Sequence, residues 1–252
     1  MSQSLERGLR VLAALAEGPR TLDQLALALD VHKSTAMRLV RTLEAERFVR
    51  REDAHRYRLG SALFALAHRA LEDLDVRTAA RPHLVELGEV SGHTAHLATL
   101  EDDQAVYVDK VDGKHPVQMY SRIGRRAPLH CTAVGKALLA LLPEPQRVRC
   151  AERIAYPQLT ASTITGPEQF LAELDGVRQR GYAVDDGEHE DFVHCLAAPV
   201  RNHRGESVAA VSVSVPKVLL DPDGLLELVD PVLRSAENIA VELGWQSTPG
   251  GG

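Results

Sequence analysis

Apolar residues in the first 45 positions recur at intervals of three and four in three separate runs, which predicts three amphipathic helices. Ser4 and Thr21 are suited to cap the first two helices, and the glycine-proline pair at 18–19 ends the first. A tight turn at 30–31 leads into the third. The positions expected to be buried are Leu5, Leu9, Leu12, Ala13 and Ala16, then Leu22, Leu25, Ala26 and Leu29, and finally Ala36, Leu39, Val40 and Leu43. The last two helices and their turn form a helix-turn-helix pattern.

Residues 47–60, "RFVRREDAHRYRLG", alternate apolar and polar positions on either side of a polar turn at 52–54, which predicts a β-hairpin. Its basic residues are Arg50, Arg51, Arg56 and Arg58. A basic hairpin after a helix-turn-helix is a wing that contacts the DNA backbone or minor groove. The pattern therefore predicts a winged helix-turn-helix DNA-binding domain over residues 1–60.

The third helix leaves hydrogen-bond donors in solvent at its N-terminal end and along its outer face, where such a helix enters the major groove. The residues predicted to contact DNA are His32, Lys33, Ser34, Thr35, Arg38, Arg41 and Thr42 on this helix, and Arg51 and Arg56 on the wing. The alternative is a three-helix interaction module whose basic face is only solvated.

A second helical pattern follows the wing. Apolar residues recur at helical spacing from Leu63 to Leu74, and again from Val76 to Val90, where Pro82 limits continuity. We expect a linker helix at 61–75 that transmits dimer geometry to the DNA-binding domain. Two ordinary packed helices would give the same periodicity.

After residue 92, short alternating runs separated by polar turns predict strands, and helical runs lie between them. Strands are expected at 93–100, 105–111, 115–123, 182–186, 195–201 and 207–216. Helices are expected at 132–142, 143–154 and 167–180, with a closing helix at 222–243 that Pro231 kinks or restarts. Helices and antiparallel hairpins around one sheet form an α+β domain, which we place at 76–246 before a disordered tail at 247–252. The fold class is thus a two-domain α plus α/β chain.

Composition supports this division into two domains. Residues 1–60 hold 11 Lys and Arg against 8 Asp and Glu, whereas the rest of the chain holds 18 against 27. A basic first domain on an acidic body suggests two different partners. No apolar run approaches the roughly 18 residues that span a bilayer, and three scattered cysteines do not suggest a disulfide framework. We therefore expect a soluble cytoplasmic protein without membrane contact.

The winged domain, "RAPLHCTAVGKALLA" at 126–140 and "GYAVDDGEHEDFVHCLAAPV" at 181–200 together resemble the IclR family of bacterial transcriptional regulators. The likeness runs from about Leu5 to Leu243 and departs at Arg201, a place usually aromatic or histidine. The resemblance implies a GAF-like effector domain, a homodimer or homotetramer, palindromic operator DNA and an organic acid as ligand. It favours a repressor that is no enzyme and needs no cofactor. The stretch from Tyr120 to Ala140 is nearest to the subgroup that senses sugar acids such as 2-keto-3-deoxygluconate.

By the same resemblance, the effector pocket consists of Met119, Ala133, Val134, Asp185, Cys195, Ser212 and Ser214. Independent support comes from Ser212 and Ser214, which alternate with valines and so share one face of a strand. Together with the N–H groups at the start of the helix at 132–142, two such hydroxyls can hold a carboxylate. Alternatively, both serines face solvent. Asp185 would favour a hydroxyl or amine on the ligand, or would be protonated.

The acidic stretch at 186–194 leaves a metal site or an enzyme as alternatives. Asp186, His189 and Glu190 would need His96 or His130 to complete a metal site. A metabolite-processing or metal-dependent enzyme with an accessory nucleic-acid-binding domain is the competing function. However, His194 and Cys195 are neighbours on a strand and point to opposite faces, so they do not form a nucleophile and its base. We expect solvated loops both at 186–194 and at "SRIGRRAP", which contains Arg122, Arg125 and Arg126.

Overall fold

The computed structural model describes residues 3–72, 75–115 and 121–246, with the backbone alone at 68–72. The chain divides into two compact units, Met1–Leu74 and Asp75–Gly252. The tail predicted to be disordered, 247–252, lies outside the described residues. Within the described ranges no helix is long and apolar enough to cross a bilayer.

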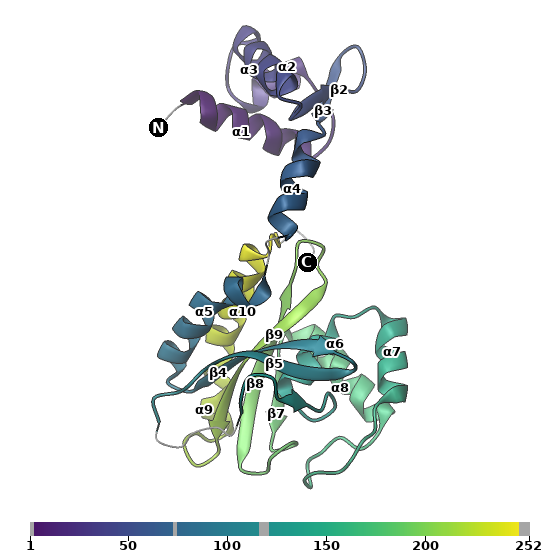
Figure 1. The fold of residues 1–252 in the computed structure, drawn as a ribbon, viewed down its shortest axis with the longest axis vertical. Coiled ribbons are helices and arrows are strands. Elements are labelled where there is room, and N and C mark those ends of the chain that lie inside the picture. The colour runs from purple at the N-terminus through teal and green to yellow at the C-terminus, as the bar shows by residue number, and fades with distance from the viewer. Residues whose placement is uncertain (1–2, 73–74, 116–120, 247–252) are drawn as a thin grey trace. The chain divides into compact units, whose positions relative to one another are not determined.

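The N-terminal unit is a winged helix-turn-helix, as predicted (Figure 1). Its elements are α1 (Gln3–Ala16), β1 (Arg20–Thr21), α2 (Leu22–Ala28), α3 (Lys33–Ala45), β2 (Val49–Arg51) and β3 (Arg56–Leu59). Thr21 caps α2 in a reciprocal capping box with Gln24. The wing strands β2 and β3 are joined by the short β1 in one antiparallel sheet, in the order β1-β3-β2.

The buried face of α1 differs from the prediction. Val11 and Leu15 enter the core of the unit, whereas Leu5 and Leu9 are 65% and 59% exposed. At 100° per residue, Leu5, Leu9 and Leu12 form one apolar stripe and Val11 and Leu15 a second stripe beside it. The sequence contains both stripes, and only packing against α2 and α3 decides which is buried.

The predicted helix after the wing is α4 (Ala62–Glu72). It exposes Phe64 at 76% and Leu66 at 56%. The N-terminal unit therefore exposes large apolar side chains on both α1 and α4. Exposed apolar patches of this kind often mark an interaction surface.

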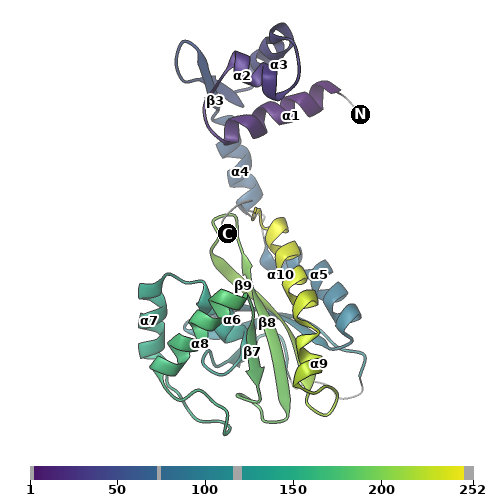
Figure 2. The ribbon, with the colours of Figure 1, turned by 180° about the vertical axis from the view of Figure 1, so that it is seen from behind.

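The C-terminal unit is an α+β domain built on one antiparallel sheet in the order β6-β5-β4-β9-β8-β7 (Figures 1 and 2). The strands are β4 (Thr94–Glu101), β5 (Gln104–Val111), β6 (Arg126–Ala127), β7 (Ala183–Asp186), β8 (Val193–Arg201) and β9 (Ser207–Pro216). The helices are α5 (Val76–Ser91), α6 (Ala133–Ala140), α7 (Glu144–Arg153), α8 (Pro167–Arg180), α9 (Pro222–Leu226) and α10 (Val229–Glu242). Helices α5 and α10 cover one face of the sheet, and α6 and α8 lie on the other.

Alternation along β9 separates these two faces. Val211, Val213 and Val215 belong to the core under α5 and α10. Ser212 and Ser214 point to the α6 side, where smaller side chains leave space. The antiparallel register places Cys195 beside Ser214, with Asp185 beside Cys195, so chemically versatile residues from three strands lie in one row.

Two predicted elements of this domain differ in the structure. The strand expected at 115–123 is absent from its described part, residues 115 and 121–123, and the short β6 follows at Arg126–Ala127 instead; residues 116–120 lie outside the described residues. The closing helix is divided into α9 and α10, with Pro231 in the first turn of α10, where a proline needs no N–H partner.

Candidate functional site

The outer face of α3 carries two unpaired arginines. Arg38 and Arg41 are exposed, and within the described ranges neither takes part in an ion pair. Thr42 is also exposed but donates its hydroxyl to the carbonyl of Arg38 at 3.1 Å. The two guanidinium groups are therefore free to meet an external anion.

The other predicted contacts at the start of α3 also serve the fold. His32 is the N-cap, and its Nδ1 accepts from the Ser34 N–H. Lys33 pairs with Asp23 of α2 at 2.7 Å. Thr35 is half-buried. These residues lie at the end of α3 that was predicted to contact DNA, and they also stabilise the helix-turn-helix.

On the wing, the predicted residues are held by carboxylates. Arg56 bonds Asp53 at 2.8 Å, and Arg51 lies 3.7 Å from Glu44 and over the Tyr57 ring. Arg50, by contrast, is exposed and pairs with no described residue.

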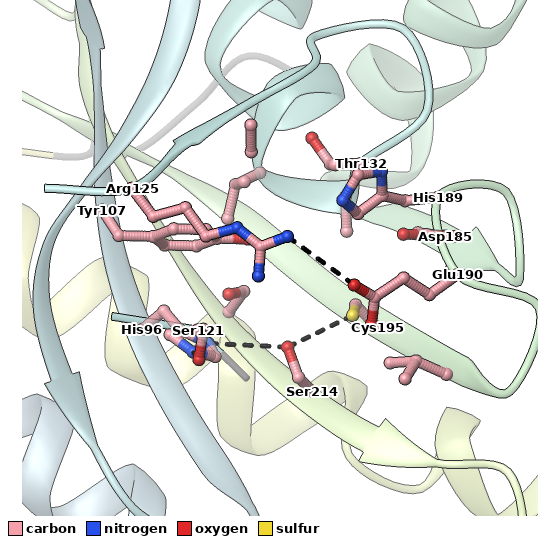
Figure 3. A pocket seen from close by; sticks show the side chains of 15 residues that line it. His96, Tyr107, Ser121, Arg125, Thr132, Asp185, His189, Glu190, Cys195 and Ser214 are labelled. Carbon is pink, nitrogen blue, oxygen red and sulfur yellow. Dashed lines mark hydrogen bonds and ion pairs between the residues drawn. The ribbon is translucent and has the colours of Figure 1, made fainter. Parts of the chain in front are cut away.

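The C-terminal domain contains a cavity between the sheet, the start of α6 and the β7–β8 loop (Figure 3). Its lining residues are His96, Tyr107, Ser121, Arg125, Ala127, Thr132, Ala133, Val134, Asp185, His189, Glu190, Val193, Cys195, Ser212 and Ser214. The space open to the centre of a water molecule is about 40 Å³, room for about three water-sized groups. A compact polar molecule fits such a space.

Six of the seven predicted effector residues line this cavity: Ala133, Val134, Asp185, Cys195, Ser212 and Ser214. The seventh, Met119, lies outside the described residues. Ser212 and Ser214 are 2% and 5% exposed, so the alternative that they face solvent is wrong. Whether the six bind a ligand remains a prediction.

Both expectations of solvated loops are wrong in part: Arg122, Arg126 and Asp186 are exposed, but other residues of the two stretches line the cavity. His189 and Glu190, from the acidic stretch, line the cavity, as does Arg125. The Arg125 guanidinium reaches across to the Glu190 carboxylate, 3.8 Å away (Figure 3). Because β7 and β8 pair directly, the short loop between them must return over the cavity. The polar composition of the loop did not predict that it lies over the cavity.

From β4 and β5, His96 was expected only as a possible metal ligand, and Tyr107 was not predicted to line a site. His96 is 1% exposed, and its ring lies 4.9 Å from that of Tyr107. Burial lowers the pKa of His96 to about 3 and raises that of the Tyr107 phenol, so both side chains are neutral. The period-two pattern could have placed them on the face of Ser212, but a histidine on a strand is not a specific signal.

Helix α6 begins at the cavity. Thr132 is its N-cap, accepting from the Gly135 N–H. Gly135 must lack a side chain, because a Cβ there would lie 2.5 Å from the Leu129 backbone. The first N–H groups of a helix lack intrahelical partners and carry partial positive charge. This end of the cavity therefore favours an anion.

Asp185 faces this end of the cavity with an unusual proton affinity. Burial raises its pKa to about 7, although it accepts the Glu188 N–H at 2.7 Å. A carboxyl with this pKa is partly protonated at neutral pH and can donate as well as accept. It therefore repels an anionic ligand less than an ordinary aspartate would.

A buried lysine of α6 binds the β7–β8 loop on the side away from the cavity. Lys136 of α6 is 1% exposed, and its Nζ bonds the Glu188 carboxylate at 2.5 Å and the Val184 carbonyl. Thr160 and Thr163 donate to the carbonyl of Glu188. The loop that carries His189 and Glu190 is thus held on the protein side.

The remaining chemistry argues against a nucleophile or metal. Burial raises the pKa of the Cys195 thiol, and the neighbouring His194 lies on the opposite face of β8. Asp186 is paired with Lys217 at 2.8 Å. Across the described residues, no three His, Cys, Asp or Glu side chains converge to hold a metal ion.

Comparison with known proteins gives a consistent result. The family description "Bacterial transcriptional regulator IclR C-terminal" matches residues 68–241, and "IclR helix-turn-helix domain" matches residues 4–53. The regulator KdgR of Escherichia coli is 34% identical over 95% of this chain and 92% of its own length. The repressor IclR of the same species is 33% identical over 96% and 90%. The crystal structure of the Agobacterium tumefaciens repressor BlcR superposes with a TM-score of 0.86 at 27% identity, covering 98% of this chain and 99% of the other. The competing enzyme function finds no support in these relatives.

Proposed function

Because the chain belongs to the IclR family of bacterial transcriptional regulators, we propose that it is a cytoplasmic repressor whose operator affinity is set by a small carboxylic acid. The acid binds in the cavity of the C-terminal domain. The observation that carries this proposal is the cavity itself, which is lined by the positive end of α6, the Arg125–Glu190 ion pair and a half-protonated Asp185. These groups complement a compact anion.

The N-terminal domain binds a palindromic operator through α3. Arg38 and Arg41 supply donors that no described carboxylate neutralises, and Arg50 supplies a third on the wing. Lys33, Arg51 and Arg56 must exchange an internal carboxylate for a phosphate, so they contribute less to affinity.

Palindromic DNA requires a dimer or a dimer of dimers. The exposed stripe of α1 supports self-association. Leu5 and Leu9 border a largely apolar groove together with Leu12, Leu39, Leu43 and Phe48, and its lining also includes Arg38 and Thr42. Regulation then needs only that the acid bind more tightly to one arrangement of the two DNA-binding domains than to another.

The proposal is tested by a gel shift with the DNA upstream of the chain's own coding region, titrated with salt and with a panel of carboxylic acids. Sequence-selective binding should persist at moderate salt, and one acid should change it by tenfold or more. Arg38→Ala and Arg41→Ala should each weaken operator binding, whereas Arg149→Ala, an exposed arginine of α7, should not. Absence of selective binding would reject the regulator, and indifference to every acid would reject the effector class.

A further inference from the structure

A chain of hydrogen bonds runs along the sheet side of the cavity (Figure 3). The Cys195 thiol donates to Ser214 Oγ at 3.2 Å, and Ser214 Oγ lies 3.5 Å from His96 Nδ1. The other ring nitrogen, Nε2, lies 2.6 Å from Ser121 Oγ. The main chain of Ser121 is fixed in turn by the Lys110 ammonium, which donates to its carbonyl at 2.9 Å.

Protonation states give this chain a direction. Because the buried imidazole of His96 is neutral, one nitrogen donates and the other accepts. In the tautomer that we assign to His96, Ser214, which already accepts from the Cys195 thiol, donates its own proton to Nδ1. Nε2–H then donates to Ser121. The hydroxyl proton of Ser121 is left for a further acceptor.

Two more hydroxyls line the cavity without a bond. Ser212 is 2% exposed, and Tyr107 is half-buried with a protonated phenol. In the part of the chain that the structure describes, neither side-chain oxygen has a hydrogen-bond partner, and Ser121 has no acceptor for its proton. All three hydroxyls line the cavity, where a bound molecule can reach them. These three hydroxyls are therefore arranged to receive an oxygen that the protein does not provide.

The acceptors nearby distinguish which oxygen fits. Asp185 and Glu190 line the same cavity and can accept a proton from the ligand. A ligand hydroxyl can make both kinds of hydrogen bond, because it accepts from the three hydroxyls and donates to a carboxylate. A keto oxygen can only accept, and an unsubstituted carbon does neither.

Resting on the proposed function above, we propose that Tyr107, Ser121 and Ser212 form a subsite for a hydroxyl on the carbon next to the ligand's carboxylate, so that the effector is a small 2-hydroxy acid. Among hydroxy acids, those with the hydroxyl on the carbon next to the carboxylate are the most compact, which suits a cavity with about 40 Å³ of space for water centres. His96 is a positioning residue, because it orients Ser121 through Nε2.

Calorimetric titration with lactate, pyruvate and propionate tests this subsite, since the three acids differ only at the second carbon. Lactate should bind about tenfold more tightly than either of the others. Ser121→Ala and Ser212→Ala should each lower the lactate-to-propionate affinity ratio by roughly three- to tenfold. Ser207→Ala, which removes a buried unpaired hydroxyl elsewhere on β9, should leave the ratio unchanged.

The lactate-to-propionate affinity ratio also tests whether His96 orients Ser121. His96→Gln retains a donor for Ser121 and should keep most of the preference, whereas His96→Phe should lose it to the level of Ser121→Ala. If His96→Phe does not fold, the serine variants decide alone. Equal affinity for all three acids, or a ratio that neither serine variant changes, would overturn the hydroxyl subsite while leaving the carboxylic acid effector intact. Failure of every acid to bind would instead reject the effector class itself.

Discussion

Asp185 is a buried carboxyl whose ionised form lowers the stability of the domain. An ordinary aspartate is ionised well below neutral pH, but burial raises the pKa of Asp185 to about 7. Its folded-state pKa lies above the unfolded value, so the folded protein holds this proton more tightly than the unfolded chain does. Ionised Asp185 therefore destabilises the domain, and this cost develops as the pH rises from about 4 to about 7 and is complete above that. Such a cost is typical of groups retained for binding.

Asp185→Asn should remove this cost. Asparagine keeps an oxygen to accept the Glu188 N–H, so the loop contact survives. At pH 8 the variant should be more stable than the parent protein by up to ~1.4 kcal/mol for each unit by which the pKa is raised, and the difference should shrink towards zero near pH 4.

Urea denaturation at several pH values measures this. Asp186→Asn, the neighbouring exposed aspartate, is the control, and it should not reproduce the pH-dependent gain. A variant less stable than the parent at pH 8 would show that Asp185 is held ionised.

At the scale of elements, a buried ion pair helps to hold the β7–β8 loop. Lys136 and Glu188 are 1% and 13% exposed in their side chains, and they join α6 to the loop that carries His189 and Glu190. Removing one partner leaves a buried charge without compensation, whereas removing both does not. The start of α6 and the loop thus form one unit around the cavity.

Lys136→Met should destabilise the protein by ~3 kcal/mol, and Glu188→Gln in the same chain should restore part of the loss. Arg153→Met breaks the exposed Arg153–Asp103 pair and should cost less than ~1 kcal/mol. Denaturant midpoints compare the parent protein, each single variant, the double variant and Arg153→Met. Additive losses in the double variant would mean that the pair is not coupled.

The apolar stripe of α1 has its own test. Leu5→Ser with Leu9→Ser should leave the fold unchanged, because both side chains are exposed. If a second copy covers them, affinity for the full palindrome should fall about tenfold or more, while affinity for an isolated half-site stays constant. Equal losses on both DNAs would place the stripe outside the self-association surface.

Periodicity predicted elements well where one face is clearly apolar. Helices α2 and α3, the hairpin of β2 and β3, and the alternation along β9 were all visible in the sequence. It failed where two stripes compete, as on α1, and where closure over a cavity depends on strand pairing far along the chain, as for Glu190. His96 and Ser121 meet across 25 residues, a contact that no local pattern specifies.

At the scale of the whole molecule, buried histidines dominate the response to acid. His93, His96, His130, His189 and His194 all have a pKa lowered by burial, so the unfolded chain takes up protons that the folded domain refuses. Their stabilisation is complete above about pH 6.5 and is lost as the pH falls. Asp185 and Glu188, whose pKa values are raised, oppose this trend but are outnumbered.

His194→Leu should therefore flatten the acid side of the stability profile. Both ring nitrogens of His194 are buried without a partner in the described structure, so leucine loses no hydrogen bond there. The unfolding midpoint should rise more at pH 5 than at pH 8. Exposed His203 replaced by leucine should not show this difference, and an equal shift at both pH values would exclude protonation as the cause.

The division of β9 into a valine face and a serine face has a consequence for how this protein can change. Mutations at Ser121, His189, Glu190 or Ser212 alter the cavity without entering either hydrophobic core of the domain. Ligand preference can therefore drift in evolution while folding stability is conserved. The same separation makes these four positions a compact library for building a biosensor with a new inducer.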